Sequence, residues 1–165
     1  MGWLNRFFGR KPAADPAAFS QLRPGDEVGS GDEAWKVTGV LFYRSAEAEW
    51  PAVKLERGQA TTWAALEGDE VVRYDPVTLQ VDADGHAQWN GRTYTRDEVG
   101  TATIERVLGA VDVHPGDTLS YQVLRCAADP QAWISVECWA GGYVEISVGR
   151  HWAVDRIVST EGRRP

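Results

Sequence analysis

The sequence is poor in the residues on which most recognisable catalytic and metal sites depend. Its three histidines, His86, His114 and His151, lie far apart, so no local metal-binding motif is present. No nucleophile elbow, phosphate-binding loop or dinucleotide fingerprint occurs. We therefore expect a protein that is not an enzyme and holds neither a metal ion nor a cofactor. An active site assembled from distant residues, around one of these histidines and a carboxylate, is the alternative that spacing does not exclude.

Cysteines and long apolar segments are also scarce. Cys126 and Cys138 are the only cysteines, and without a secretory signal two cysteines do not make a disulfide framework, so free buried thiols are expected. No apolar run approaches the roughly 20 residues that a membrane-spanning helix needs. The start of the chain lacks the apolar region and cleavage site of a secretory signal. We expect a cytoplasmic protein.

Positive charge is in short supply outside the first residues. The chain carries 17 basic and 24 acidic residues, a net charge of −7. Such a surface repels phosphate backbones, so nucleic acid is not an expected partner. Arg6, Arg10 and Lys11 give residues 1–11 a charge of +3. This asymmetry predicts a basic tail with a separate role.

The basic tail combines charge with aromatic residues. On a helical wheel Trp3, Leu4, Phe7 and Phe8 share one face, and Arg6 and Arg10 lie on the other. This pattern is typical of a short amphipathic helix at a membrane surface. Residues 1–20 are interpreted as this tail, including Lys11, followed by a Pro/Ala linker. Docking to a membrane or a partner is one reading. Packing of the aromatics onto the body, or disorder, is the other.

From Leu22 onward the pattern predicts β-structure, because Gly, Pro and Asp turns punctuate short β-branched and aromatic runs. We expect an all-β body of two similar, tightly joined units, 21–82 and 83–165, each a small barrel or sandwich. A weak match between Phe42–Trp50 and Val123–Trp133 suggests an internal duplication. Asn90-Gly91 predicts a two-residue hairpin turn, and residues 96–99 a single helical turn. Strands are expected near 34–44, 50–56, 61–66, 70–74, 77–82, 86–89, 92–95, 102–112, 118–126, 132–139, 143–148 and 152–158.

The last hairpin has the best-defined register. Ile134, Val136 and Cys138 must share a face with Val144, Ile146 and Val148. Only a three-residue loop, 140–142, keeps these two faces in step.

This register places two carboxylates opposite each other on the second face of the hairpin. Glu137 faces Glu145, with Trp133, Trp139 and Tyr143 on the same side. Such a face suits an ammonium ion or a polyamine. The alternative is that Arg125, Arg150 or another base pairs with the glutamates on a solvated face.

Several of these elements resemble a bacterial family of domains of unknown function, the one numbered four-one-seven-eight. The resemblance covers about residues 21–158. After the matching Trp50 the family shows an acidic and an aromatic residue, where this chain has Pro51-Ala52-Val53, so a family site in the first unit would be absent here. The matching segments are Leu22–Asp26, Trp35–Gly39, Trp50–Leu55, Trp63–Leu66, Ser135–Trp139 and Glu145–Gly149.

The resemblance implies an accessory role in bacterial envelope-stress or defence systems. The family accompanies phage-shock-protein-A-like proteins, small membrane-channel-like proteins and polyamine-modifying enzymes. We therefore expect a non-enzymatic interaction domain, peripheral at the inner face of the membrane, whose tail contacts the membrane or a membrane-stress protein. The alternative is a domain that binds a small cation such as a polyamine through the acidic, aromatic hairpin face.

Overall fold

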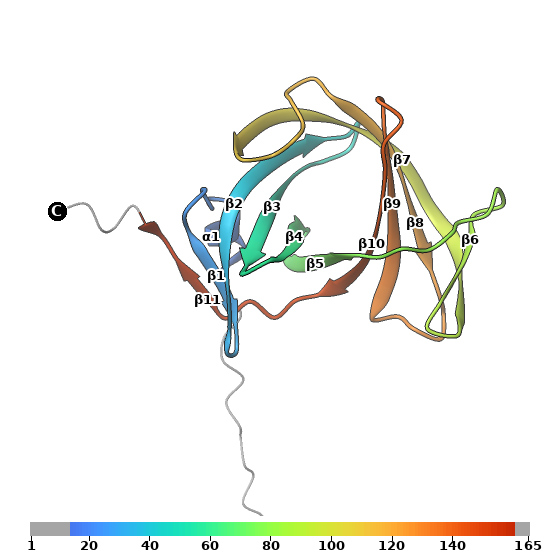
Figure 1. The fold of residues 1–165 in the computed structure, drawn as a ribbon, viewed down its shortest axis with the longest axis horizontal. Helices are drawn as coiled ribbons and strands as arrows, with labels where there is room; N and C mark the ends of the chain where they lie inside the picture. Colours follow the sequence, from blue (N-terminus) through green and yellow to red (C-terminus); the bar gives the residue numbers. More distant parts are fainter. Residues whose placement is uncertain (1–13, 161–165) are drawn as a thin grey trace, which may run out of the picture.

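Short segments rich in β-branched and aromatic residues alternate with glycine-containing turns, and most segments pair with the next along the chain. The computed structural model describes residues 14–160 and has one antiparallel sheet of eleven strands (Figure 1). The elements are α1 (Pro16–Phe19), β1 (Glu27–Ser30), β2 (Glu33–Arg44), β3 (Glu49–Arg57), β4 (Ala60–Glu67), β5 (Glu70–Pro76), β6 (His86–Trp89), β7 (Arg92–Gly109), β8 (Thr118–Arg125), β9 (Ala132–Trp139), β10 (Val144–His151) and β11 (Arg156–Val158).

Eight of the strands close into a barrel. The order β2-β3-β4-β5-β10-β9-β8-β7 returns to its start because β2 also pairs with β7. Strands β1 and β11 extend the sheet beyond β2 on one side of the barrel, and β6 extends it beyond β7 on the other (Figure 1). The strands of both expected units therefore form one closed barrel, with β2–β5 from the first unit and β7–β10 from the second.

Most expected strands are confirmed, and seven of them match within two residues at each end: β2, β3, β4, β5, β6, β8 and β9. The two-residue turn is confirmed as well, since Trp89 pairs with Arg92 and both Asn90 and Gly91 have positive φ, at 50° and 71°. The last two strands are displaced from their expected ranges, to Val144–His151 and Arg156–Val158.

Three local predictions were wrong. Residues 96–99 form no helical turn, because they pair with β8 within the continuous strand β7, where a register shift between Arg96 and Glu98 absorbs the extra residue. Segment 77–82 contributes only a bridge from Val81 to Ala87. Strand β1 was not predicted.

The end of the expected linker is part of the body. Asp15 accepts a hydrogen bond from the Ala17 N–H and begins α1, which carries Phe19 into the core. Residues 1–13 lie outside the described part of the chain, and with them the expected amphipathic helix and all of its proposed docking residues. No helix in the described part is long and apolar enough to cross a membrane.

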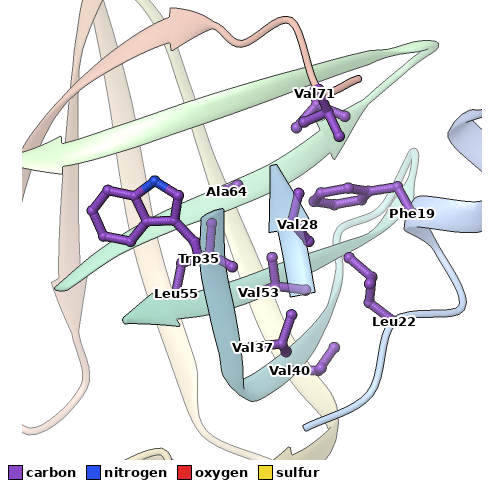
Figure 2. Packing of buried hydrophobic residues seen from close by; sticks show 11 residues of the cluster. Phe19, Leu22, Val28, Trp35, Val37, Val40, Val53, Leu55, Ala64 and Val71 are labelled. Carbon is purple, nitrogen blue, oxygen red and sulfur yellow. The ribbon is translucent and has the colours of Figure 1, made fainter. Parts of the chain in front are cut away.

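The outer face of the barrel is covered by two separate hydrophobic clusters. The first outer cluster packs β2–β5 against α1 and β1, with Phe19 and Leu22 directed toward Val28 and Val53 (Figure 2). The second outer cluster centres on Tyr94, Leu124, Ile134 and Val136 and is covered by β6 and the segment before it. Burial of each such side chain contributes about 1.5–3 kcal/mol, so the packed outer faces stabilise the barrel. The inner face of the same strands is then left to other residues.

Candidate functional site

The inner face of the barrel lines a cavity of about 1140 Å³. Aromatic rings from six strands line it: Tyr43, Trp50, Trp63, Tyr74, Tyr121, and both Trp133 and Trp139 of β9. The lining also includes residues of the turns after β2 and β4, residues 111–113 and residues 140–141. Eight acidic side chains and only two basic ones, Lys54 and Arg125, line it. This imbalance favours a cationic occupant over an anionic one.

The aromatic rings contact one another around the cavity wall. Tyr43 stacks on Trp50 with ring centres 5.3 Å apart, and Trp50 meets the edge of Tyr121 at 6.4 Å. Tyr74 and Trp133 pack edge-to-face at 6.5 Å. Gly149 makes room for this second pair, because a Cβ atom there would lie 2.5 Å from Trp133 Nε1. The wall therefore depends on a residue without a side chain.

The predicted carboxylate pair lies inside the barrel. Glu137 on β9 is the cross-strand partner of Glu145 on β10, and Val144 pairs with Cys138, which confirms the register predicted from the sequence. The three-residue loop is present too, with Gly142 at φ 84° and its N–H donating to the Trp139 carbonyl at 2.8 Å. Both glutamates line the cavity.

No basic side chain in residues 14–160 forms an ion pair with either carboxylate of this pair. Arg125, one expected partner, contacts Asp97 through Nε at 3.2 Å and lies over the Trp133 ring at 5.1 Å. Arg150, the other, lies over Trp89, also at 5.1 Å. The face is thus inside the barrel, and neither named arginine neutralises it.

The surroundings of the pair favour protonation. Burial, and then the charge of Glu145, raise the pKa of Glu137 to about 7. Burial also raises the pKa of Glu145. The pKa of Tyr43 rises well above its ordinary value through its own burial and the nearby Glu137 and Glu145. The two carboxylates therefore lie in a poorly solvated site that lacks a compensating positive charge.

Another acidic group in the cavity lining lies beside Tyr74. The Tyr74 hydroxyl donates a hydrogen bond to Glu67 and accepts one from Trp133 Nε1 at 3.4 Å. Burial raises the pKa of Glu67, against the opposing effects of this hydrogen bond and of Arg125. Tyr74 thus connects Glu67 to the aromatic wall.

The other candidate residues of the hairpin also line the cavity, at different depths. Trp133 is 4% exposed, Trp139 is half-buried, and Tyr143, at the end of the hairpin, is 64% exposed. The sequence analysis missed the other aromatic residues of the lining as site residues: Tyr43, Trp50, Trp63, Tyr74 and Tyr121. The odd-numbered residues of β4, Trp63, Ala65 and Glu67, gave a period-two signal. That signal separates the two faces of β4, but only the closure of the barrel shows that this face lines a cavity.

The three histidines lie beside carboxylates, and His151 also packs against Trp133 of the cavity wall with ring centres 5.2 Å apart. His86 is 3.5 Å from Asp82, His114 is 3.8 Å from Asp117 and His151 is 2.9 Å from Glu70. None of the three lines the cavity. Within residues 14–160, no group of three or more His, Cys, Asp or Glu side chains is arranged to hold a metal ion.

Comparison with known proteins gives one positive finding. Neither the curated proteins nor the solved structures contain a match to the chain. A family model described as "Domain of unknown function (DUF4178)" matches residues 23–153, which contain the entire barrel. The resemblance noted from the sequence is thereby confirmed, and the chain belongs to the DUF4178 family of domains of unknown function.

Proposed function

We propose that this domain is a non-enzymatic binding protein that holds a small organic cation inside its barrel. One observation carries the proposal: two carboxylates, Glu137 and Glu145, face each other across a cross-strand pair in a cavity where no basic group of residues 14–160 forms an ion pair with them. Like charges placed directly opposite each other in a sheet are destabilising. An ammonium group between them removes that cost.

The aromatic wall supports an organic cation rather than a small hydrated metal ion. Tyr43, Trp50, Tyr121 and Trp133 present ring faces and edges to the same cavity as the glutamates. An ammonium over an aromatic face gains about 0.5–2 kcal/mol, more when it is desolvated. Methylene groups of the ligand gain about 0.8 kcal/mol each on burial. A polyamine combines both kinds of group, and spermidine is the probe we would use.

The test is thermal unfolding of the full chain with and without spermidine at pH 8 and 150 mM salt. A ligand at 100 times its dissociation constant stabilises the folded protein by about 2.7 kcal/mol. We expect a clear rise in Tm for the wild type and none for Glu137→Gln/Glu145→Gln.

The matched control is Glu27→Gln/Asp32→Asn, which removes two exposed negative charges that do not line the cavity. This variant should keep the full rise in Tm. An equal rise in both double variants would contradict the proposal, because it would show that spermidine responds only to the overall negative charge.

We also propose, from the sequence and the family resemblance, that the domain serves a bacterial membrane-stress or defence system at the inner face of the membrane. The basic, aromatic pattern of residues 3–11 supports this, since Trp3, Phe7 and Phe8 share one helical face. Co-sedimentation of the full chain with anionic vesicles tests it. Binding should fall in Trp3→Ser/Phe7→Ser/Phe8→Ser and at high salt. Equal binding by this variant and the wild type would contradict the role of the tail.

The internal duplication is retained as a proposal, with a changed correspondence. In the barrel, β2–β5 and β7–β10 are two meanders joined through the β2–β7 and β5–β10 pairs. This order relates β2 to β7, whereas the sequence match relates the strand ending at Arg44 to the strand ending at Arg125. The topology supports a repeat of four strands. We favour the correspondence in which β2 is equivalent to β7.

A further inference from the structure

The register of β9 and β10 fixes the two carboxylates of the pair opposite each other. Glu137 and Glu145 are fixed in direct opposition by hydrogen-bonded pairs on either side of them, from Val144–Cys138 to Arg150–Ala132. Neither strand can slide, since a shift of one residue would turn the apolar outer face into the cavity. The second outer cluster, which includes Ile134 and Val136, therefore holds the two acids together.

The groups around the pair on the neighbouring strands are weak acids. On β8, Tyr121 is the cross-strand partner of Glu137. Tyr43 on β2 and Tyr74 on β5 lie close enough to Glu137 for its charge to raise their pKa values, after their own burial. These three hydroxyls remain protonated at neutral pH, because burial raises the pKa of each of them further. Each hydroxyl can donate a hydrogen bond to a carboxylate, but it does not neutralise the negative charge.

The charged side chains elsewhere in the cavity wall do not compensate the pair. Lys54 on β3 lies 4.0 Å from Glu56, and Arg125 on β8 is bonded to Asp97. Glu67 on β4 and Glu98 on β7 are acidic and act on Tyr74 and Tyr121. Asp112 and Asp117, from the segment between β7 and β8, add further negative charge to the lining.

A proton is the smallest cation that can relieve this arrangement. Two carboxyl groups that interact strongly lose their protons in two separate steps that belong to the pair. The burial of both groups and the charge of Glu145, which raise the pKa of Glu137 to about 7, are consistent with a pair that retains one proton near neutral pH.

We propose that the Glu137–Glu145 pair shares one proton while the cavity is empty, and that an organic cation entering the barrel displaces this proton to the solvent. The inference rests on the proposed function and adds its regulation: loading releases a proton, and acidification unloads the barrel. The proton passes from the carboxyl pair to buffer and one ammonium group takes its place, so the pair keeps the same net charge of about −1 in both states.

The experiment is isothermal titration of the full chain with spermidine in two buffers of different ionisation enthalpy, at pH 6.5 and pH 8.5. Alkylammonium groups have pKa values near 10, so the ligand itself loses no proton at pH 6.5. We expect about one proton released per spermidine at pH 6.5 and almost none at pH 8.5. The dissociation constant should fall up to tenfold per pH unit between pH 5.5 and 7 and then level off.

Two variants separate the pair from the rest of the protein. Glu137→Gln should bind spermidine more weakly, with no proton release and with little dependence on pH. Glu27→Gln/Asp32→Asn should keep the proton release of the wild type. Binding of spermidine to the wild type without proton release at pH 6.5 would overturn the inference and leave the proposed function intact.

A second measurement decides the outcome in which spermidine does not bind at all. That result overturns the proposed function, and carbon-13 NMR of the glutamate side chains in the empty protein then tests the shared proton by itself. One carboxyl of the pair should titrate near pH 7 and lose this step in Glu137→Gln. Titration of both Glu137 and Glu145 near their ordinary values would overturn the inference independently of any ligand.

Discussion

The two faces of the barrel wall are made by alternating residues of the same strands, and they differ in almost every physical respect. In β9, Ile134 and Val136 face outward into a closely packed apolar cluster, while Ser135 and Glu137 face the cavity. In β3, Val53 and Leu55 are completely buried in the first outer cluster, while Lys54 faces inward. The inner face also has a buried apolar cluster, around Leu41, Ile104 and Leu119, but there it adjoins charged side chains and a cavity.

This difference indicates that the outer face mainly stabilises the barrel, while the charged groups of the proposed binding site lie on the inner face. The outer clusters are covered by α1, β1 and β6, which lie outside the barrel. They stabilise the barrel from outside, while the inner face combines an apolar cluster of its own with charged side chains and a cavity, which lower stability. The predictions below separate the two faces, starting with the largest expected effect.

An outer residue should be costly to truncate. Leu55→Ala removes a fully buried side chain from the first outer cluster and should lower the free energy of unfolding by about 2–5 kcal/mol, measured by urea denaturation. Lys54→Ala, the adjacent residue on the inner face, is the matched control and should cost much less. Equal losses in the two variants would show that the outer face does not contribute more to stability than the inner face.

The inner face should make stability fall as the pH rises. The pKa of Glu137 is about 7 when folded and near 4.5 when unfolded, so the unfolded chain loses this proton first. Its contribution is fully present below pH 4.5 and is lost as the pH rises through 7. At 1.36 kcal/mol per pKa unit this amounts to about 3 kcal/mol.

Urea denaturation at pH 5 and pH 8 measures this effect, and the difference between variants removes the contributions of other acids. Glu137→Gln should flatten the profile and be more stable than the wild type at pH 8. The exposed Glu27→Gln should leave the profile unchanged. If the wild type instead gained stability relative to Glu137→Gln between pH 5 and pH 8, the carboxyl group of Glu137 would not be buried with a raised pKa.

The aromatic wall should depend on Gly149. A methyl group there would meet Trp133 and Tyr74, and we expect Gly149→Ala to cost about 1–3 kcal/mol through this overpacking. The near-ultraviolet circular dichroism of the aromatic rings should change at the same time. Gly141→Ala, in a loop where a Cβ meets nothing within 4 Å, is the control. An unchanged spectrum in Gly149→Ala would mean that the rings do not pack as described.

The smallest effect is expected at the end of the hairpin. Tyr143 is 64% exposed, and Tyr143→Ser should change the free energy of unfolding by less than about 0.5 kcal/mol. Trp133→Ser, on the same hairpin face but buried, should cost several times more. A large loss of stability in Tyr143→Ser would place this ring in a packed contact that the structure does not show.

The sequence predicted the local pairing well and the closure of the barrel not at all. The β9–β10 register followed from the apolar alternation of Ile134, Val136 and Cys138 and from one constraint on loop length. Closure depends on the β2–β7 and β5–β10 pairs, whose members are separated by tens of residues. Alternation shows that a strand has two different faces, but it does not say which of them faces a cavity.

The missed elements have physical reasons as well. Pro16–Phe19 was interpreted as linker because a single helical turn has no periodicity, and the capping by Asp15 and the burial of Phe19 depend on tertiary contacts. Residues 96–99 were predicted to form a single helical turn, and three consecutive polar residues, Arg96, Asp97 and Glu98, interrupt the strand alternation there. A bulge in β7 produces the same interruption.

The most direct test of the account is the stoichiometry of spermidine binding at pH 8 and 150 mM salt, measured by isothermal titration of the wild type and of Glu137→Gln/Glu145→Gln. The account predicts one saturable site per chain in the wild type, and no such site in the variant. The same isotherm in both proteins, or weak binding without saturation in both, would show that the carboxylate pair inside the barrel is not a cation site.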